Sequence, residues 1–402
     1  MAKILFIPCE DGFGPSALLS YIVKDMLKKR LSWKVTVWNK SRFNYNTKLY
    51  SKEISENKLV VKPISSIIEL EKTNGRVSVS KTFSNLLHYH KQRENYPEDN
   101  SSEYFDMVVD FGTPMAARWA SKKNMKTISV FDHCWSKTLE MILGEYKESK
   151  FKGKDNSTLK KWNQLIESIK EEEKNTQRLF LFKYITPPLY YEAWKKLIDG
   201  HKITPIQGVF GRSTLKIKNG TTICIQGGDT PAWDKLLFSI VYKFSDDKKD
   251  ILKNSNITFR IYIPDRIANA PGFKPLFSGH CPWIKPLSLM EGTTLTPLLS
   301  ESDFLVTRAG GGTVNDAIAC RVPFISVEEP LQKQVNETMK MCIKNGITRK
   351  ISYNKFIENP LDIILEEFNR KEENNRIKSS MDKIPDNLEA LITEEIIKKV
   401  EG

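Results

Sequence analysis

The chain has 402 residues, 40% of them apolar and 28% charged, which is enough for two domains that each bury a core. No apolar run approaches the ~20 residues of a membrane-spanning helix, and no signal peptide precedes the first strand, so the sequence predicts a cytoplasmic protein. The six cysteines form no Cys-x-x-Cys pair, which argues against a zinc or dithiol site and fits a reducing compartment.

The net charge is +13 at pH 7, and such an excess favours anionic partners. A nucleotide sugar, an acidic acceptor, an anionic membrane face and nucleic acid all fit this charge, nucleic acid least. Lysines dominate the excess and are scattered along the chain, so a solvated surface explains it equally well. Peripheral membrane contact therefore stays open.

The first expected elements form half of a Rossmann-type domain. Residues 3–7 are an apolar strand, residues 8–14 a loop with two glycines, residues 17–29 a helix and residues 33–38 a second strand. Strand, glycine loop, helix and strand in this order are typical of nucleotide-binding α/β folds.

A later strand, residues 127–131, ends in a candidate for catalysis. Asp132 and His133 follow it directly, at the strand end where open α/β sheets place their sites. His133 can serve as a general base near neutral pH, with Asp132 orienting it. Equally, Asp132 caps a helix that begins near Ser136, and His133 packs against Trp135.

A linker and a second α/β half follow. Residues 200–219 combine glycine, proline and basic residues, as an interdomain linker does, and a new strand begins at residues 221–225. A loop with two glycines connects this strand to a helix at residues 232–244. The loop either approaches a ligand or is a tight turn alone.

The next βαβ unit contains a glycine triplet. A strand at residues 304–307, glycines at 310–312, a helix at 314–320 and a strand at 324–327 follow one another. Thr313 is expected to cap the helix. Backbone N–H groups and the helix dipole favour an anion at such a helix start, so the gap fits a phosphate. A tight turn that packs helix on strand is the alternative.

Residues 303–327 resemble the donor-binding segment of GT-B glycosyltransferases. The resemblance is to the branch with the UDP-glycosyltransferases and the UDP-N-acetylglucosamine transferase of peptidoglycan lipid synthesis. In that family an aspartate precedes the strand and a Ser/Thr-Arg pair ends it. Small residues and a threonine follow, and an acidic residue lies three positions on. The corresponding residues are Asp303, Thr307, Arg308, Gly310, Gly311, Gly312, Thr313 and Asp316.

This resemblance implies that the C-terminal half binds a nucleotide-diphosphate sugar. Asp316 would accept hydrogen bonds from the ribose, and the backbone of residues 310–313 would stabilise the diphosphate. Arg308 would hold a phosphate or anchor the loop. The residues implied for phosphate approach in the earlier glycine loop are Gly227, Gly228 and Thr230.

Two further stretches are assigned by the same resemblance. Residues 289–293 correspond to the nucleobase-binding loop of the family, but the residue-by-residue alignment with that loop is not fixed. Glu329 and Gln334 are candidates for contacts with the sugar hydroxyls, because relatives carry an acidic residue or a glutamine there. Gln332 competes with Gln334 for this role.

The resemblance also implies an acceptor site in the N-terminal half. Gly12 and Gly14 correspond to the Gly-x-Gly loop of the family, after which relatives often carry a histidine. Here Pro15 stands in that place. The general base is therefore open among His133, Asp11 and Asp132, with the first two ranked level.

The expected fold is α/β, with two Rossmann-like domains facing a cleft. Residues 1–204 would form the acceptor domain, residues 205–385 the donor domain, and residues 386–402 a helix that packs back on the first domain. The expected activity is a metal-independent inverting glycosyl transfer that needs no cofactor. Its donor would be UDP-linked, and its acceptor the hydroxyl or amine of a small molecule, a lipid-linked compound or a glycan. A nucleotide-sugar hydrolase or epimerase and a non-catalytic protein that binds an anionic polymer are the alternatives.

Overall fold

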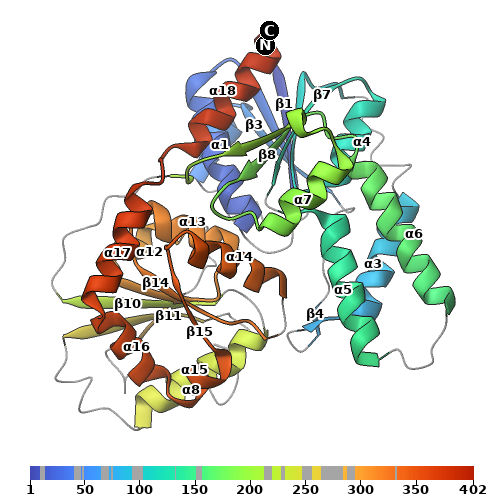
Figure 1. Cartoon of the computed structure of the whole chain (residues 1–402). Coiled ribbons are helices and arrows are strands. Elements are labelled where there is room, and N and C mark those ends of the chain that lie inside the picture. The colour runs from blue at the N-terminus through green and yellow to red at the C-terminus, as the bar shows by residue number, and fades with distance from the viewer. Residues whose placement is uncertain are drawn as a thin grey trace. The chain divides into compact units, whose positions relative to one another are not determined.

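The computed structural model describes most of the chain (Figure 1). The described residues are 1–9, 14–39, 47, 49–64, 72–73, 76–92, 103–131, 133–150, 156–211, 220–227, 231–246, 256–263, 284–287, 295–330 and 333–402.

The chain folds into two compact units. Unit 1 contains residues 1–73, 77–207 and 388–402, and unit 2 contains residues 74–76 and 208–387. The chain therefore passes from unit 1 to unit 2 after Gln207 and returns after Asn387.

Unit 1 is built on a seven-stranded sheet whose neighbouring strands are all parallel. The strand order is β3-β2-β1-β6-β7-β8-β9, so the winding reverses between β1 and β6. This reversal is the switch point of a doubly wound sheet. The strands are β1 (Lys3–Pro8), β2 (Lys34–Asn39), β3 (Leu59–Pro63), β6 (Met107–Phe111), β7 (Lys126–Phe131), β8 (Leu179–Phe182) and β9 (Ile203–Ile206).

The strands of unit 1 are mostly uninterrupted buried runs, which is the pattern of a parallel sheet covered on both faces. A short pair, β4 (Lys72–Thr73) and β5 (Arg76–Val77), forms a separate two-stranded sheet. The helices between the strands are α1 (Gly14–Lys29), α2 (Ser51–Ser55), α3 (Val79–Gln92), α4 (Pro114–Lys122), α5 (Trp135–Lys150), α6 (Asn156–Glu173), α7 (Pro188–Leu197) and the 3-10 turn η2 (Gly200–Lys202).

The last helix of the chain, α18 (Leu388–Glu401), also belongs to unit 1, where it packs on α1 (Figure 1). Its apolar side buries Ile392 and Ile396. Its polar side pairs with the end of α1, where Arg30 Nε lies 2.8 Å from Glu401 Oε1. The last helix of the chain therefore packs in the same unit as the first helix, α1.

Unit 2 contains a six-stranded parallel sheet with the order β12-β11-β10-β13-β14-β15. The winding reverses between β10 and β13, so this unit is doubly wound as well. The strands are β10 (Thr221–Gln226), β11 (Ile257–Tyr262), β12 (Ile284–Leu287), β13 (Phe304–Thr307), β14 (Phe324–Val327) and β15 (Arg349–Ile351). The helices are α8 (Pro231–Asp246), α12 (Thr296–Leu299), α13 (Gly311–Ala319), α14 (Lys333–Lys344), α15 (Tyr353–Glu358), α16 (Pro360–Asn369) and α17 (Lys371–Asp382).

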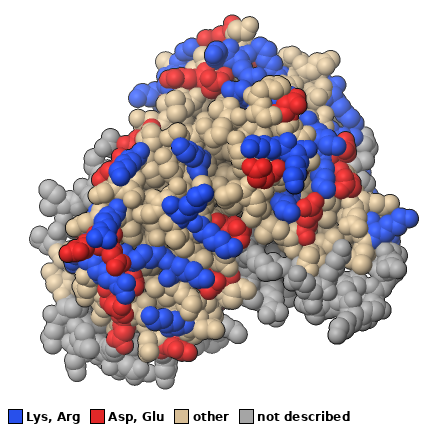
Figure 2. Space-filling model, in the orientation of Figure 1, with Lys and Arg blue, Asp and Glu red and all other residues tan. Residues whose placement is uncertain are grey.

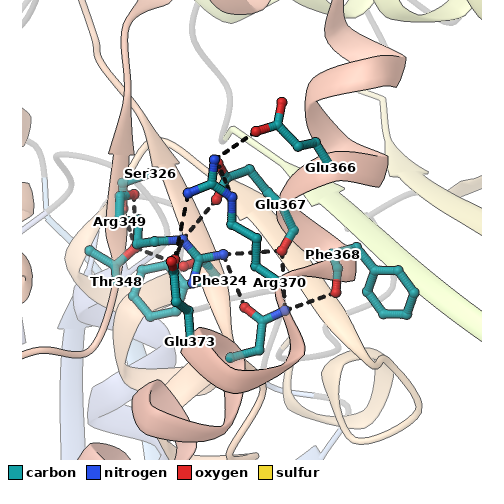
Figure 3. Close-up of polar contacts among 10 residues, drawn as sticks. Phe324, Ser326, Thr348, Arg349, Glu366, Glu367, Phe368, Arg370 and Glu373 are labelled. Carbon is teal, nitrogen blue, oxygen red and sulfur yellow. Dashed lines mark hydrogen bonds and ion pairs between the residues drawn. The ribbon is translucent and has the colours of Figure 1, made fainter.

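The edge strand β15 is fixed by an arginine cluster (Figure 3). Arg349 donates from Nε to Glu367 Oε2 at 2.7 Å and from Nη2 to the Glu367 carbonyl at 3.1 Å. Asn374 accepts from Arg349 at 3.0 Å and donates to the carbonyl of Phe368 at 2.9 Å. The cluster fastens α16 and α17 to the sheet.

The structure shows how charged side chains are distributed on one face and whether the described helices could span a membrane. On the face shown in Figure 2, acidic side chains are interspersed among the lysines and arginines. Within the described segments, no helix combines the length and apolar content needed to cross a bilayer.

Candidate functional site

The candidate donor site begins at the switch point of unit 2. Here β10 and β13 lie side by side in register, with Gln226 opposite Thr307 at their carboxyl ends. Open α/β sheets bind ligands outside the strand ends at such a point. The two glycine loops predicted from the sequence therefore begin at the same sheet edge.

Gly227 follows β10 and lies against the indole of Trp233. A Cβ atom on Gly227 would be 1.7 Å from Trp233 Cδ2. The indole is 2% exposed and belongs to the core of unit 2, so it has no room to move aside. Glycine is required here by packing.

Gly310 is different. It is the N-cap of α13, with φ −63° and ψ 139°, which any residue can adopt. No described atom lies within 4 Å of a Cβ built on it. Among the described residues, neither backbone conformation nor packing requires a glycine at this position, so they leave room for a ligand beside the helix start.

The start of α13 differs from the sequence expectation by three residues. The helix begins at Gly311, so Thr313 lies inside its first turn and does not cap it. Thr313 instead donates from Oγ1 to Gln226 Oε1 at 2.9 Å. This bond joins the first turn of α13 to the end of β10. The first N–H groups of a helix lack intrahelical acceptors, so this turn can bind an anion.

Arg308 pairs with Glu329, and both side chains are largely buried. Their Nη1 and Oε2 atoms are 3.5 Å apart, with 15% and 2% of the side chains exposed. Asn336 fixes the backbone of Glu329, accepting from its N–H at 2.9 Å and donating to its carbonyl at 2.7 Å. Of the two roles expected for Arg308, this geometry favours the anchoring of the loop.

Asp316 lies on α13 and is 6% exposed. Its carboxylate accepts from Asn315 Nδ2 at 3.3 Å, and also from the Thr296 side chain and the Leu295 N–H at the start of α12. Burial raises the pKa of Asp316 to about 7, and these hydrogen bonds act in the opposite direction. A carboxyl group held in this way is fixed in orientation.

In unit 1, His133 follows β7 and is half-buried. Its ring centroid lies 5.4 Å from that of Phe131 and 5.3 Å from that of Tyr190. Its carbonyl accepts from Trp194 Nε1 at 2.7 Å. The backbone of His133 is thus fixed from α7, and its ring packs against Phe131 and Tyr190.

Glu173, at the end of α6, caps the helix that follows His133. Its carboxylate accepts from the Trp135 N–H at 2.7 Å and from Ser136 Oγ at 2.5 Å. Trp135 in turn donates from Nε1 to the Gly112 carbonyl at 2.8 Å. Burial raises the pKa of Glu173 to about 7 against these hydrogen bonds.

The remaining candidates of the acceptor and donor sides have different outcomes. Gly14, expected in the loop after β1, is the first residue of α1, so this helix begins earlier than its apolar pattern suggests. Gln334 is the second residue of α14, and its side chain lies outside the described part. The candidates that lie entirely outside the described residues are Asp11, Gly12, Asp132, Gly228, Thr230, Gln332 and residues 289–293.

No protein-family model and no curated protein matches the chain. Solved structures match it over its whole length. The glycosyltransferase of kitacinnamycin has a TM-score of 0.63 at 12% identity, with 99% of each chain covered. UGT89C1 of Arabidopsis thaliana, solved with UDP-L-rhamnose, has a TM-score of 0.59 at 12% identity, with 99% of each chain covered. MurG of Acinetobacter baumannii has a TM-score of 0.50 at 12% identity, covering 99% of this chain and 100% of MurG.

The chain has the GT-B fold. This confirms the fold class expected from the sequence. The likeness extends well beyond that segment, because nearly the entire chain is superposed.

Three residues that support the candidate sites were not predicted from the sequence. Gln226 and Asn315 make hydrogen bonds within unit 2, and Glu173 makes them within unit 1. Their partners are distant in sequence, and a single sequence gives no signal for such pairs. Among the described residues, no group of three or more His, Cys, Asp or Glu side chains could hold a metal ion. Metal independence remains a prediction.

Proposed function

We propose that the protein is an inverting glycosyltransferase that takes a UDP-linked sugar as donor. Unit 2 binds the donor, and unit 1 binds an acceptor with a hydroxyl or amine nucleophile. Support comes from the fold, which is that of solved glycosyltransferases, among them one solved with UDP-L-rhamnose.

The observation that carries this proposal is the geometry of the unit 2 switch point. Gln226 and Thr313 join the two loop-bearing strand ends at 2.9 Å. The open first turn of α13 lies beside Gly310, and the buried carboxylate of Asp316 lies farther along the same helix. A diphosphate at the helix start and a ribose hydroxyl at Asp316 therefore fit one nucleotide.

In the proposed reaction, the acceptor oxygen or nitrogen attacks the anomeric carbon as the bond to the diphosphate breaks. A general base in unit 1 removes the proton of the nucleophile. His133, Asp11 and Asp132 remain the candidates, and His133 is held by Trp194 at the carboxyl end of β7. The first turn of α13 stabilises the negative charge on the departing diphosphate.

Arg308 and Glu329 support the donor site in this proposal. Their buried pair fixes the loop between β13 and α13 against the end of β14. Replacing Arg308 would remove the positive charge that faces the buried Glu329 carboxylate, which is costly. Contacts of Glu329 and Gln334 with the sugar, a cytoplasmic location and peripheral membrane contact remain predictions.

The first test is a thermal-shift screen with UDP, GDP, ADP, TDP and CDP on the wild type and on Asp316→Ala. A ligand that binds only the native state adds about 2.7 kcal/mol of stability at a hundred times its dissociation constant. We expect UDP to give the largest shift in the wild type and a clearly smaller shift in Asp316→Ala.

Asp303→Ala is the matched control. Asp303 accepts from the Thr222 N–H at 2.7 Å, at the opposite end of the same two strands. This variant should lower the melting temperature but keep the shift that UDP causes. No shift with any of the five nucleotides in the wild type would reject the proposal.

A second test separates transfer from the alternative reactions. Purified protein is incubated with UDP-sugars, with and without a panel of hydroxyl and amine acceptors, and UDP release is measured. A transferase needs the acceptor, whereas a hydrolase releases UDP without one. Affinity for a polyanion that falls steeply with salt, together with no turnover, would indicate the binding protein instead.

A further inference from the structure

Asn315 is fully buried on α13, and its side-chain amide makes three hydrogen bonds. Its Oδ1 accepts from the Phe210 N–H at 2.8 Å, and its Nδ2 donates to the Phe210 carbonyl at 3.2 Å. The same Nδ2 donates to Asp316 Oδ1 at 3.3 Å. Both N–H groups and the oxygen of the amide are therefore engaged.

The backbone of Phe210, to which this amide bonds, lies where the chain enters unit 2. Phe210 is fully buried and lies three residues after Gln207, where the chain leaves unit 1. Its neighbour Val209 donates from its N–H to the Pro385 carbonyl at 3.0 Å. Pro385 lies just before the chain returns to unit 1 at Leu388. The entering and leaving segments of unit 2 are thus joined directly beside Asn315.

The leaving segment is also fastened to the far end of α13. Arg321, two residues beyond the helix, has a φ of 55° and donates from Nη2 to Asp386 Oδ1 at 2.9 Å. Its Nε donates to Asp382 Oδ1 at 3.1 Å. The helix that carries Asp316 is therefore fixed along its length by the two segments that Asn315 and Arg321 bind.

We propose that Asn315 is a positioning residue for nucleotide binding, which orients the Asp316 carboxylate toward the ribose. This inference rests on the proposed function. A carboxylate offers about four acceptor positions, and Asn315, Thr296 and Leu295 occupy three of them. These three hydrogen bonds fix the orientation of the carboxylate, and the proposal assigns a further acceptor position to a ribose hydroxyl. A preorganised acceptor binds more tightly than one that must be ordered by the ligand.

The test is a double-mutant cycle on nucleotide affinity, measured by isothermal titration calorimetry with the nucleoside diphosphate that the thermal screen selects. The full-length variants are Asn315→Ala, Asp316→Ala and the double variant. We expect Asn315→Ala to weaken binding about tenfold, the size of one hydrogen bond to a charged group. In the Asp316→Ala background, the same change should have no further effect, because Asn315 acts through Asp316.

Asn374→Ala is the matched control for a purely structural role. Asn374 is also an asparagine of unit 2 whose side chain makes three hydrogen bonds, to Arg349 and to the carbonyls of Glu367 and Phe368. It is 5% exposed. Its removal should lower the melting temperature but leave the nucleotide dissociation constant unchanged.

Asn315→Asp is the second variant, in case Asn315→Ala does not fold. It has the same shape and keeps an acceptor for the Phe210 N–H, but a carboxylate oxygen replaces the amide that donates to Asp316 and to the Phe210 carbonyl. We expect weaker nucleotide binding than in the wild type, with Phe210 still protected from hydrogen exchange.

The results of these experiments distinguish the positioning role of Asn315 from the proposed function. Wild-type affinity in both Asn315 variants, or losses that add in the double variant, would overturn the positioning role and leave the proposed function intact. A wild type that binds none of the five nucleoside diphosphates would overturn both.

Discussion

Two glycines at the carboxyl ends of neighbouring strands have different physical roles. Gly227 after β10 lies where a Cβ would overlap the buried indole of Trp233. Gly310 after β13 has an ordinary backbone conformation, and no described atom lies within 4 Å of a Cβ built on it. The first glycine supports the fold, whereas the second leaves room where we place the diphosphate.

Alanine substitutions should separate these roles. Gly227→Ala should lower the free energy of unfolding by about 1–3 kcal/mol, because overpacking forces the Trp233 ring or the backbone to shift. Gly310→Ala should change it by about 0.5 kcal/mol or less, yet weaken nucleotide binding if the phosphates approach this backbone. Urea denaturation and calorimetry measure the two effects. Equal stability losses in both variants would contradict this assignment.

At the scale of the helix, buried carboxylates accept from backbone N–H groups at three helix starts. Glu173 accepts from the Trp135 N–H at the start of α5. Asp110 accepts from the Thr113 N–H before α4, and Asp316 accepts from the Leu295 N–H before α12. Carboxylates are favoured at helix N-termini because free N–H groups and the helix dipole attract negative charge. In this protein the carboxylates come from other elements or from the preceding strand.

Glu173, which caps α5, should make the free energy of unfolding depend on pH. Burial raises the pKa of Glu173 to about 7 from 4.5, so the folded protein retains a proton that the unfolded chain has lost between these values. The stability from this group is therefore fully present below pH 4.5 and is lost as the pH rises through about 7.

Glu173→Gln removes this titration. The advantage of the wild type over the variant in unfolding free energy should shrink as the pH rises from about 4.5 to about 7, and then stay constant. Urea denaturation at a series of pH values measures this difference. A difference that grows with pH would show that the capping hydrogen bonds outweigh burial and lower the pKa instead.

At the scale of the molecule, the chain returns to its first unit for its last helix. α18 buries Ile396 completely, while Leu391 on the same helix is 47% exposed. Its ion pairs with α1 are surface pairs, which contribute little to stability. The apolar contacts of α18 therefore provide most of its attachment to unit 1.

Ile396→Ala should destabilise unit 1 selectively, by about 2–4 kcal/mol. Hydrogen exchange measured by mass spectrometry should show faster opening of β1 and β6, with β10 and β13 unchanged. Leu391→Ala is the control on the same helix and should change stability by about 0.5 kcal/mol or less. Equal acceleration in both units would mean that they unfold as one cooperative body.

The sequence by itself determined the fold class and predicted the place of the candidate donor site. Buried parallel strands are continuous apolar runs, and the loops that follow them carry glycines, so β10, β13 and their loops could be recognised locally. The resemblance of residues 303–327 pointed to the GT-B fold, which the solved structures confirm.

Only the tertiary structure decided which polar groups meet. Asn315 bonds to Phe210 across 105 positions, and Glu173 bonds to Ser136 across 37. Arg308 faces Glu329, and Thr313 bonds to Gln226 inside a helix turn that it was expected to cap. Hydrophobic period and glycine spacing are local properties of the chain. A hydrogen-bond partner depends on which strand ends the winding of the sheet brings together, and no local pattern carries that information.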